Sequence, residues 1–489
     1  MHWTKKHLVL ICFLLKCTLL HAQTIAGDLA DPSVIKVGSV YYATGTSSEW
    51  APYFPIYKSS NLKDWQQTGY VFDKAPEWTT GSFWAPEYYK IGDTYYIYYT
   101  ARRKSDNRSY IGVATSRFPD KGFTDHGVII EHGKEAIDAF VFNDGGQRYI
   151  TFKAYGLDDR PIELLGAKLS ADGLKTAGDF FTLLKDTSRA GMEGQSILKI
   201  NNYYYLFYSG GNCCGNGCSY NVSVARSPNF KGPYQSFNGN PILSENDGWK
   251  CMGHGTFVSG EDGNMYYLHH AYNKKSNVFT GREAMLSKLI YQEYTGWPAL
   301  KLLPNNTEAK SDGNSLARYW QWDFRHATPS YKVQKGLLRL SGKQTKDNLT
   351  GIALTVKPTS DNFEITTAVV NRNKALKGLT IYGDANAAMG IGVEGDSVKV
   401  WKVEKNERVV INAAKVPAST IGLKIGMSPN KTCSFSYQTD EVTWIELASG
   451  VKTGFLPQWD RSPRLGLHYR GTEKDKAEFS FFRLENKTN

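Results

Sequence analysis

Gly92-Asp93-Thr94-Tyr95-Tyr96-Ile97-Tyr98-Tyr99 is a short turn followed by an aromatic run, and a similar turn recurs along the chain. In each copy, a Gly or Asn is followed three positions later by a Tyr that heads a strand-like run. Aromatic side chains suit pleated strands, and Gly or Asn suits their turns. The five copies are Gly38 to Tyr41, Gly92 to Tyr95, Gly146 to Tyr149, Asn201 to Tyr204 and Gly263 to Tyr266. The Tyr-to-Tyr spacings of 54, 54, 55 and 62 residues indicate an internal repeat.

Each repeat has room for about four short strands. A second segment ending in or near Ser follows each aromatic run, namely Ile56–Ser59, Gly112–Ser116, Gly166–Ser170, Ser223–Ser227 and Ala284–Ser287. Repeats of this length with about four strands are typical of β-propeller blades. A single sandwich would not use the same Tyr turn five times. The sequence therefore predicts an all-β chain with a five-bladed propeller over residues 23–303.

An ionisable side chain stands at the beginning of each predicted innermost strand. These residues are Asp31, Glu87, Asp138, Glu193 and His254. Strands packed around one axis bring their starts together, so we expect all five side chains at the mouth of the central channel. One such residue alone would ordinarily cap a turn, but gathering like charges costs several kcal/mol unless they are paired or protonated. Carboxyls with separated pKa values can serve as base and acid in the hydrolysis of a glycosidic bond.

Six motifs in this region resemble those of glycoside hydrolase family 43, of the arabinofuranosidase and β-xylosidase type. They are Asp31-Pro32-Ser33-Val34, Trp84-Ala85-Pro86-Glu87, Ile137-Asp138, Glu193-Gly194-Gln195-Ser196, Gly253-His254-Gly255 and Gly281-Arg282-Glu283. The resemblance implies a five-bladed propeller that hydrolyses arabinose- or xylose-containing glycans with inversion.

The resemblance also implies roles for individual residues. Asp31 matches the general base, Glu193 the general acid, and Asp138 the acid that orients Glu193 and raises its pKa. Inversion requires the base and the acid about 6.5–9.5 Å apart, with room for a water molecule. As a neighbouring anion, Asp138 is expected to hold Glu193 protonated near neutral pH.

Three further positions are expected to bind substrate, namely Arg282, His254 and Glu87. In many members of the family, the histidine matched by His254 lies beside a central calcium or its water shell, which implies Ca²⁺ at the propeller axis. Glu87 replaces the Asp that often follows Trp-Ala-Pro, and Gln195 stands where Pro is frequent, so both changes are expected to reshape the pocket.

Several other aromatic and imidazole side chains lie near these motifs. Trp50, Trp78 and Trp84 are equally consistent with stacking on sugars and with core packing, although Trp84 is expected to be structural. His269 and His270 are expected to be ordinary strand histidines rather than a metal pair.

Residues 1–22 have the features of a signal peptide, with Lys5 and Lys6 before an apolar core and a cleavage site after Ala22. The apolar run is too short for a membrane anchor. We therefore expect export to the periplasm or the extracellular space, without a membrane span in the mature chain. The formal charge is +11, but no block of five Lys or Arg residues indicates a nucleic-acid partner.

Five cysteines follow the signal peptide: Cys213, Cys214, Cys218, Cys251 and Cys433. Their spacing does not fit a zinc site. An exported chain favours a disulfide within the Gly-rich loop or from it to Cys251. The connectivity stays open, and the odd number leaves at least one free thiol.

The repeat ends near residue 300, and residues 304–315 are polar enough to form a linker. Short alternating segments then predict a β-sandwich over residues 316–489, without clustered carboxyls or histidines. These segments are Leu337–Leu340, Phe363–Val370, Gly378–Tyr382, Ser397–Val403 and Phe479–Leu484. The region resembles the sandwich appended to many exo-acting members of the family. It could wall off the active-site mouth, bind glycan or serve packing alone.

The leading interpretation is an exported, inverting exo-glycosidase that releases terminal α-L-arabinofuranosyl or β-D-xylosyl residues from arabinose- or xylose-containing glycans. An exo-β-galactanase and an endo-acting arabinanase are alternatives within the family. From another class, a non-catalytic glycan-binding propeller could retain the fold. Such a module would not need Asp31, Asp138 and Glu193 together, which favours the enzyme.

Overall fold

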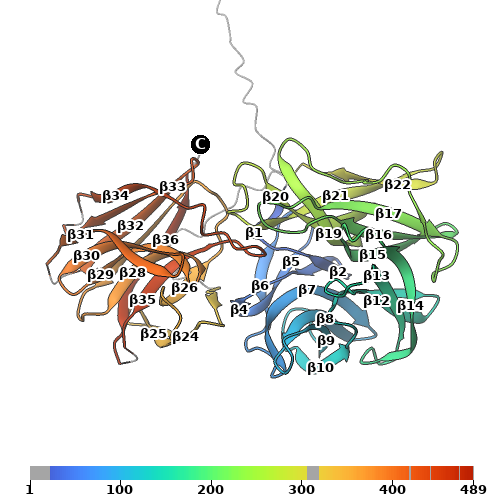
Figure 1. The fold of residues 1–489 in the computed structure, drawn as a ribbon, viewed down its shortest axis with the longest axis horizontal. Coiled ribbons are helices and arrows are strands. Elements are labelled where there is room, and N and C mark those ends of the chain that lie inside the picture. The colour runs from blue at the N-terminus through green and yellow to red at the C-terminus, as the bar shows by residue number, and fades with distance from the viewer. Residues whose placement is uncertain (1–22, 305–318, 418–419, 441, 473, 488–489) are drawn as a thin grey trace, which may run out of the picture.

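The computed structural model of the protein describes residues 23–304, 319–417, 420–440, 442–472 and 474–487. All regular elements in these ranges are β-strands, which confirms the predicted all-β class. Figure 1 shows them in two groups that lie side by side. The predicted signal peptide and nearly all of the predicted linker lie outside the described residues. Across the described part of the chain, no helix is suited to crossing a membrane.

The N-terminal group contains five antiparallel sheets. The first comprises β2 Ser33–Val37, β3 Val40–Thr44, β5 Tyr53–Ser59 and β6 Gln66–Phe72. The second comprises β7 Thr79–Ile91, β8 Thr94–Arg103, β9 Ser109–Ser116 and β10 Thr124–Ile130. The third comprises β11 Ala136–Asp144, β12 Gln147–Ala154, β13 Ile162–Leu169 and β14 Thr176–Asp186. The fourth comprises β15 Met192–Ile200, β16 Tyr203–Gly210, β17 Asn221–Ser227 and β18 Gln235–Ser236. The fifth comprises β19 Trp249–Ser259, β20 Met265–Asn273, β21 Arg282–Gln292, β22 Trp297–Leu302 and the N-terminal β1 Gln23–Asp28.

The recurring Tyr turn joins the first two strands of every sheet. Its turn residue always has a left-handed backbone, which Gly and Asn adopt at the least cost. The φ values are 60° at Gly38, 57° at Gly92, 99° at Gly146, 54° at Asn201 and 75° at Gly263. The sequence repeat thus corresponds to one hairpin used five times.

The first strands of the five sheets contact one another in chain order, from β2 through β7, β11 and β15 to β19. β19 contacts β2 again, and β1 pairs with β21, so the beginning of the domain completes its last sheet. Apolar side chains fill the spaces between neighbouring sheets. Tyr98 of β8 and Phe152 of β12 belong to one such cluster, for example. This arrangement brings the starts of the first strands together.

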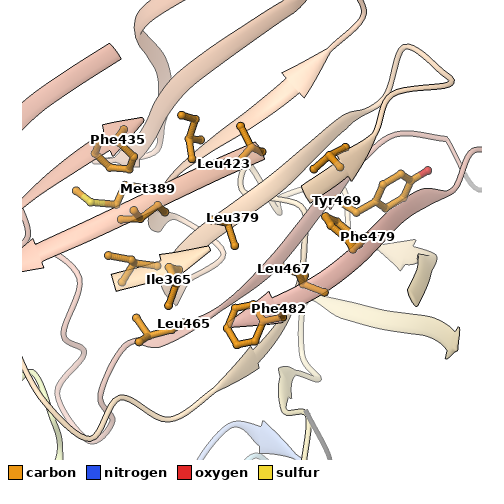
Figure 2. Close-up of a cluster of buried hydrophobic side chains, with 14 of the residues drawn as sticks. Ile365, Leu379, Met389, Leu423, Phe435, Leu465, Leu467, Tyr469, Phe479 and Phe482 are labelled. Carbon is orange, nitrogen blue, oxygen red and sulfur yellow. The ribbon is translucent and has the colours of Figure 1, made fainter. Parts of the chain in front are cut away.

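The C-terminal group is a two-sheet sandwich. Its seven-stranded sheet comprises β24 Ala327–Gln334, β25 Leu337–Gln344, β36 Ala477–Asn486, β27 Phe363–Val370, β32 Thr420–Ser428, β33 Thr432–Gln438 and β34 Ile445–Lys452. Its six-stranded sheet comprises β26 Ile352–Val356, β35 Arg464–Arg470, β28 Leu376–Asp384, β29 Ala387–Glu394, β30 Ser397–Glu404 and β31 Glu407–Lys415. β27 alternates buried and half-buried residues, as its sequence predicts. Ile365 and Phe479 of one sheet belong to the same core as Leu379 and Leu467 of the other (Figure 2).

The two domains share a strand pair and a buried ion pair. β23 Trp322–Asp323 pairs with β4 Trp50–Ala51. Nη2 of Arg464 in the sandwich lies 3.1 Å from Oδ2 of Asp28. Trp50 is 1% exposed beneath the Arg464 guanidinium, so its proposed stacking on sugars is excluded in favour of core packing.

The prediction that the C-terminal region lacks clustered carboxyls and histidines is wrong. Ligand atoms of Asp323, His326 and Asp384 lie within 4.8 Å of one another. Arg325 and Arg461 both pair with Asp384, and His326 bonds with Asp323 at 2.8 Å. Because cations already balance these carboxylates, the group is an ion-pair network beside the strand pair that joins the domains.

Candidate active site

Asp31 precedes β2, and Asp138 and Glu193 lie within the first three residues of β11 and β15, as expected. Glu87 and His254 instead lie well inside β7 and β19, so the prediction that all five begin a strand is wrong for these two. φ is 49° at Asp31, 61° at Asp138 and 39° at His254, and the register shifts near the latter two. Glu87 and Glu193 lie near further left-handed residues, Ala85 and Gly194. Left-handed backbone at a residue with a side chain costs about 1–2 kcal/mol and persists where the surroundings fix it.

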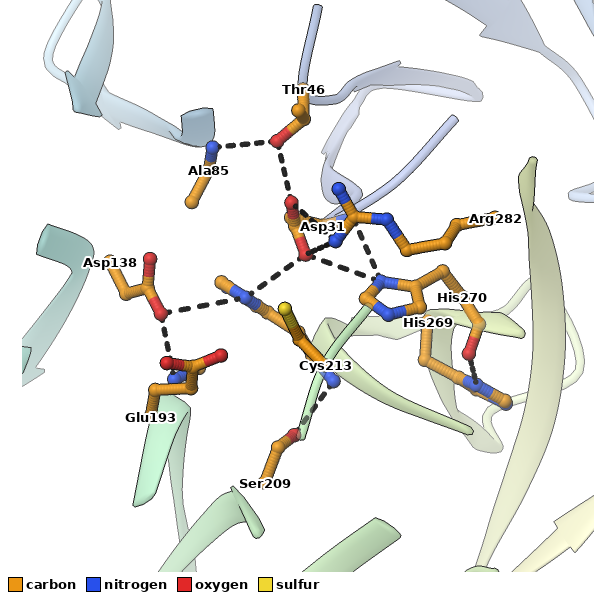
Figure 3. A network of polar contacts seen from close by, with 12 residues as sticks. Asp31, Thr46, Ala85, Asp138, Glu193, Ser209, Cys213, His269, His270 and Arg282 are labelled. Carbon is orange, nitrogen blue, oxygen red and sulfur yellow. Dashed lines mark hydrogen bonds and ion pairs between the residues drawn. The ribbon is translucent and has the colours of Figure 1, made fainter. Parts of the chain in front are cut away.

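His254 links the carboxyls of two sheets, those of Asp31 and Asp138, which Figure 3 labels. Its Nδ1 lies 3.4 Å from Oδ1 of Asp31 and 3.7 Å from Oδ2 of Asp138. Burial alone would lower the pKa of His254, but Asp138 and Asp31 outweigh it and raise the pKa to about 9. A Cβ on Gly194 would lie 2.6 Å from Cγ of His254, so a larger residue there would displace the ring. The predicted convergence of Asp31, Asp138 and His254 is therefore present.

Asp31 is held as an anion by a set of donors. Oγ1 of Thr46 donates to its Oδ2 at 2.6 Å, and Nη1 of Arg282 lies 3.2 Å from its Oδ1. The Asp31 amide donates to Nδ1 of His270 at 3.0 Å. Burial would raise the pKa of Asp31, but Arg282 and the two histidines hold it well below its usual range. Arg282, expected to bind substrate, therefore contacts the residue predicted to be the base.

Glu193 has two polar partners. Oε2 lies 2.7 Å from Nζ of Lys153, and the Tyr220 hydroxyl donates to Oε1 at 3.0 Å. Lys153 also lies 3.5 Å from Oε1 of Glu135. The Glu193 side chain is 19% exposed, against 10% for Asp31 and 7% for Asp138, so it is the most accessible of the three carboxyls.

The proton distribution between Asp138 and Glu193 differs from the expected one. Burial raises the pKa of Asp138 to about 7. Burial alone would also raise the pKa of Glu193, but the Lys153 ammonium outweighs this effect, so the pKa of Glu193 lies below its usual value. In the ligand-free site, Asp138 therefore holds the proton more readily than Glu193. The expectation that Asp138 alone keeps Glu193 protonated omits the Lys153 ammonium, which favours the Glu193 carboxylate.

Glu87 lies at the same end of the ring but is 5% exposed. Its Oε2 accepts from the Ser33 hydroxyl at 2.7 Å, and its Oε1 accepts from the Val141 amide at 3.4 Å. Burial raises its pKa to about 8. These contacts join three neighbouring sheets. Substrate contact by Glu87 stays a prediction that this geometry does not favour.

A calcium ion would require six to eight oxygen ligands. Nδ1 of His254 already faces two carboxyls, and Asp31 is engaged by Arg282 and Thr46. Among the described residues, the metal-ligand type side chains that lie close together are Asp323, His326 and Asp384, and the residues around His254 do not form such a group. The residues present therefore do not fit a directly ligated ion at His254, and a calcium bound through water stays a prediction.

Three residues around the site, Lys153, Tyr220 and Asp460, were missed in the sequence, and the contact of a fourth, His270, with Asp31 was not expected. Lys153 and Tyr220 bond with Glu193, and His270 bonds with Asp31. Asp460 of the sandwich accepts from Nη2 of Arg282 through its carbonyl at 3.2 Å and from Nε1 of Trp84 through Oδ2 at 3.1 Å. The Trp84 contact agrees with the structural role expected for that residue.

The remaining aromatic and histidine predictions have mixed outcomes. Trp78 stacks on Tyr99 in a packed cluster, which agrees with core packing. His269 is buried and bonds with Oγ of Ser287 at 2.9 Å, as expected of a strand histidine. His270 is more than that, because its neutral ring supports Asp31; burial lowers its pKa to about 4.

Two disulfides lie beside the site. Cys218 pairs with Cys251, and Cys213 pairs with its neighbour Cys214. Both arrangements left open by the sequence, a bond within the loop and a bond from the loop to Cys251, are therefore present. Cys433 is the buried free thiol of the described residues. The Cys218–Cys251 bond ties the loop after β16 to β19, and Cys213 packs against the cluster that contains Tyr220 and Tyr272.

Comparison with known proteins agrees with this geometry. Residues 23–298 match the model of glycosyl hydrolases family 43, and residues 311–484 match the β-xylosidase C-terminal concanavalin A-like domain. The extracellular exo-α-(1→5)-L-arabinofuranosidase ArbA of Cellvibrio japonicus is 29% identical over 61% of this chain and 92% of its own length. The extracellular endo-α-(1→5)-L-arabinanase 1 of Bacillus subtilis is 28% identical over 55% of this chain and 87% of its own length.

A solved structure shows the same fold over both domains. The family 43 protein BlXynB of Bacillus licheniformis has a TM-score of 0.81 at 20% identity and covers 95% of this chain and 99% of its own. The family match spans the N-terminal group of sheets as far as residue 298, within β22, and contains Asp31, Asp138, Glu193 and His254. This chain therefore belongs to glycosyl hydrolases family 43 and is a glycosidase of that family.

Proposed function

We propose that this glycosidase is an exported, inverting exo-enzyme that releases terminal α-L-arabinofuranosyl or β-D-xylosyl residues from arabinose- or xylose-containing glycans. The observation that carries the proposal is the convergence of Asp31 and Asp138 on His254, with Glu193 joined to Asp138 through the amide of the next residue, Gly194. Relatives named as an arabinofuranosidase and an arabinanase support the substrate class. Both are named extracellular, which supports the periplasm or the extracellular space as the location.

In the proposed reaction, Asp31 accepts a proton from the attacking water, and Glu193 protonates the leaving oxygen. Inversion is a single displacement, so both proton transfers belong to one step. Asp31 suits the role of base because Thr46 and Arg282 orient its ionised carboxylate. The role of acid requires the proton on Glu193 when the glycosidic oxygen arrives. Asp138, whose pKa of about 7 lies near neutrality, is the adjacent group able to hold that proton beforehand. The Gly194 amide donates to Oδ2 of Asp138 at 3.1 Å and positions this carboxyl.

Exo action is supported by the sandwich. Asp460 contacts Arg282 and Trp84, so a loop of the second domain reaches one side of the site. A wall there favours a pocket that accepts a chain end over an open groove. We also infer that the five sheets are the blades of a five-bladed propeller over residues 23–303. The inference rests on the circular contacts of their first strands and on the β1–β21 pairing.

The test uses the mature chain from about residue 23, incubated with aryl α-L-arabinofuranoside, β-D-xyloside and β-D-galactoside. We expect turnover of the arabinofuranoside or the xyloside, absence of that turnover in Asp31→Ala, and a first product of inverted anomeric configuration by NMR. Turnover of the galactoside alone would replace the proposal with an exo-β-galactanase. Binding of arabinan or xylan without turnover of any substrate would indicate a glycan-binding propeller.

A further inference from the structure

Cys213 forms a disulfide with its neighbour Cys214 and lies beside the polar network that contains Asp31 and Glu193 (Figure 3). It begins the loop that follows β16, the strand paired with the strand of Glu193. Cys213 packs on the cluster containing Tyr220, whose hydroxyl bonds with Glu193. The Gly215 amide donates to the Tyr272 hydroxyl at 3.2 Å. The disulfide is therefore fixed to the same framework that holds the predicted general acid.

A cavity of about 400 Å³ separates this loop from a loop of the sandwich. Cys214 and Gly215 form one side, and Pro457, Gln458 and Trp459 form the other. Its volume is within the usual range for small-ligand sites.

One wall of the cavity is connected to the predicted general acid and the other to the predicted general base. The disulfide wall reaches Glu193 through Tyr220. On the other wall, Asp460 follows Trp459 directly, and its carbonyl accepts from Arg282, which pairs with Asp31. Each wall of the cavity is therefore one or two contacts away from a predicted acid or base, and the cavity lies where the two domains meet.

The lining favours a neutral sugar ring. None of the nine described residues that line the cavity carries a charge. Trp459 is 61% exposed, although a large aromatic surface is ordinarily buried. Its indole and the side chains of Cys214 and Pro457 offer apolar surface for the C–H face of a ring, whereas the amides of Asn212, Asn216 and Gln458 suit hydroxyl groups.

We propose that the Cys213–Cys214 disulfide and Trp459 form the two walls of a binding site for the sugar unit on the leaving-group side of the scissile bond. The inference rests on the proposed function. The disulfide closes a small covalent ring and fixes the loop, so little conformational freedom remains to be lost when a sugar binds. Specificity for the second sugar then depends on both domains.

The experiment compares two substrates that carry the same terminal sugar. One is the matching trisaccharide, α-1,5-arabinotriose or β-1,4-xylotriose, and the other is the glycosyl fluoride, whose leaving group is too small to reach the walls. In Trp459→Ala, and in the double variant Cys213→Ala/Cys214→Ala, we expect the ratio of kcat/KM for trisaccharide to kcat/KM for fluoride to fall about tenfold. Trp459→Phe should recover most of that ratio.

Tyr294→Ala is the matched control, because Tyr294 is wholly exposed on the β21–β22 turn and should leave the ratio unchanged. An equal loss on both substrates in Trp459→Ala, or an unchanged ratio in both wall variants, would overturn the proposal. Failure of the proposed function looks different, because the unmodified enzyme would then hydrolyse neither substrate. Melting temperatures of all variants identify any that fail to fold, and if one of the two wall variants does so, the other carries the comparison.

Discussion

Nζ of Lys153 lies 2.7 Å from Oε2 of Glu193, inside the cluster of carboxyls. The ammonium is buried and also lies near Glu135. The Lys153 ammonium favours the ionised form of Glu193, the predicted general acid. The buried Asp138 nearby holds a proton more readily than Glu193 does. The alkaline side of the pH–rate profile should therefore depend on Lys153.

Lys153→Met should shift that side of the profile. Without the ammonium, the pKa of Glu193 rises, so the acid stays protonated to higher pH. We expect the alkaline limb of kcat/KM to move upward by about one pH unit. Lys168→Met, on an exposed position of β13, serves as the control. A limb that moves downward, or not at all, would contradict this account.

Glu193→Ala should separate substrates by their leaving groups. Removal of a general acid typically lowers the rate about 100- to 10,000-fold when the leaving oxygen needs a proton. Oligosaccharides should show that loss in kcat/KM, whereas a dinitrophenyl glycoside should show much less. The measurement is the slope of log kcat/KM against leaving-group pKa, which should steepen in the variant. An unchanged slope would assign the acid role elsewhere.

His254→Gln should change how stability depends on pH. The pKa of His254 is about 9 in the folded chain and about 6.5 when unfolded, so its contribution is complete below pH 6.5 and is lost as the pH rises to 9. The difference in free energy of unfolding between the parent and the variant should shrink by about 1–3 kcal/mol over that window. Urea titrations at pH 6 and pH 9 measure it. The charged groups that face the imidazole, Asp31, Asp138 and Glu193, are present in both proteins. If the difference in free energy of unfolding between them does not depend on pH, the His254 ring is neutral in the folded chain.

Arg464→Met should be strongly destabilising because it leaves the Asp28 carboxylate buried without its cation. Removal of one partner of such a pair typically costs about 3–5 kcal/mol in free energy of unfolding. The double variant Asp28→Asn/Arg464→Met should recover part of this loss, as a double-mutant cycle would show. If the two single changes are simply additive, the pair does not couple the domains.

The repeated hairpins and the residues in phase with them could be predicted from the sequence. Contacts set by how strands pair or how the domains pack could not. The Tyr turns repeat a local left-handed conformation, so their residues reveal the hairpins. The ionisable residues before them share a phase, so their convergence follows from the repeat. Lys153 reaches the site because β12 pairs it with Ile137 of β11, next to Asp138, and no local pattern distinguishes it from other strand lysines. Asp460 contacts Arg282 through packing between domains across 178 positions of chain.

Because Asp460 contacts Arg282, the sequences of both domains determine the geometry of the active site. A substitution that moves the 457–460 loop will shift the Arg282 guanidinium and, through it, the Asp31 carboxylate. The loop has this effect although it contains neither the predicted base nor the predicted acid. Exchanging the sandwich for that of another family member would therefore exchange a piece of the active site. Natural variation in substrate preference can accumulate in the second domain while the carboxyls of the first remain fixed.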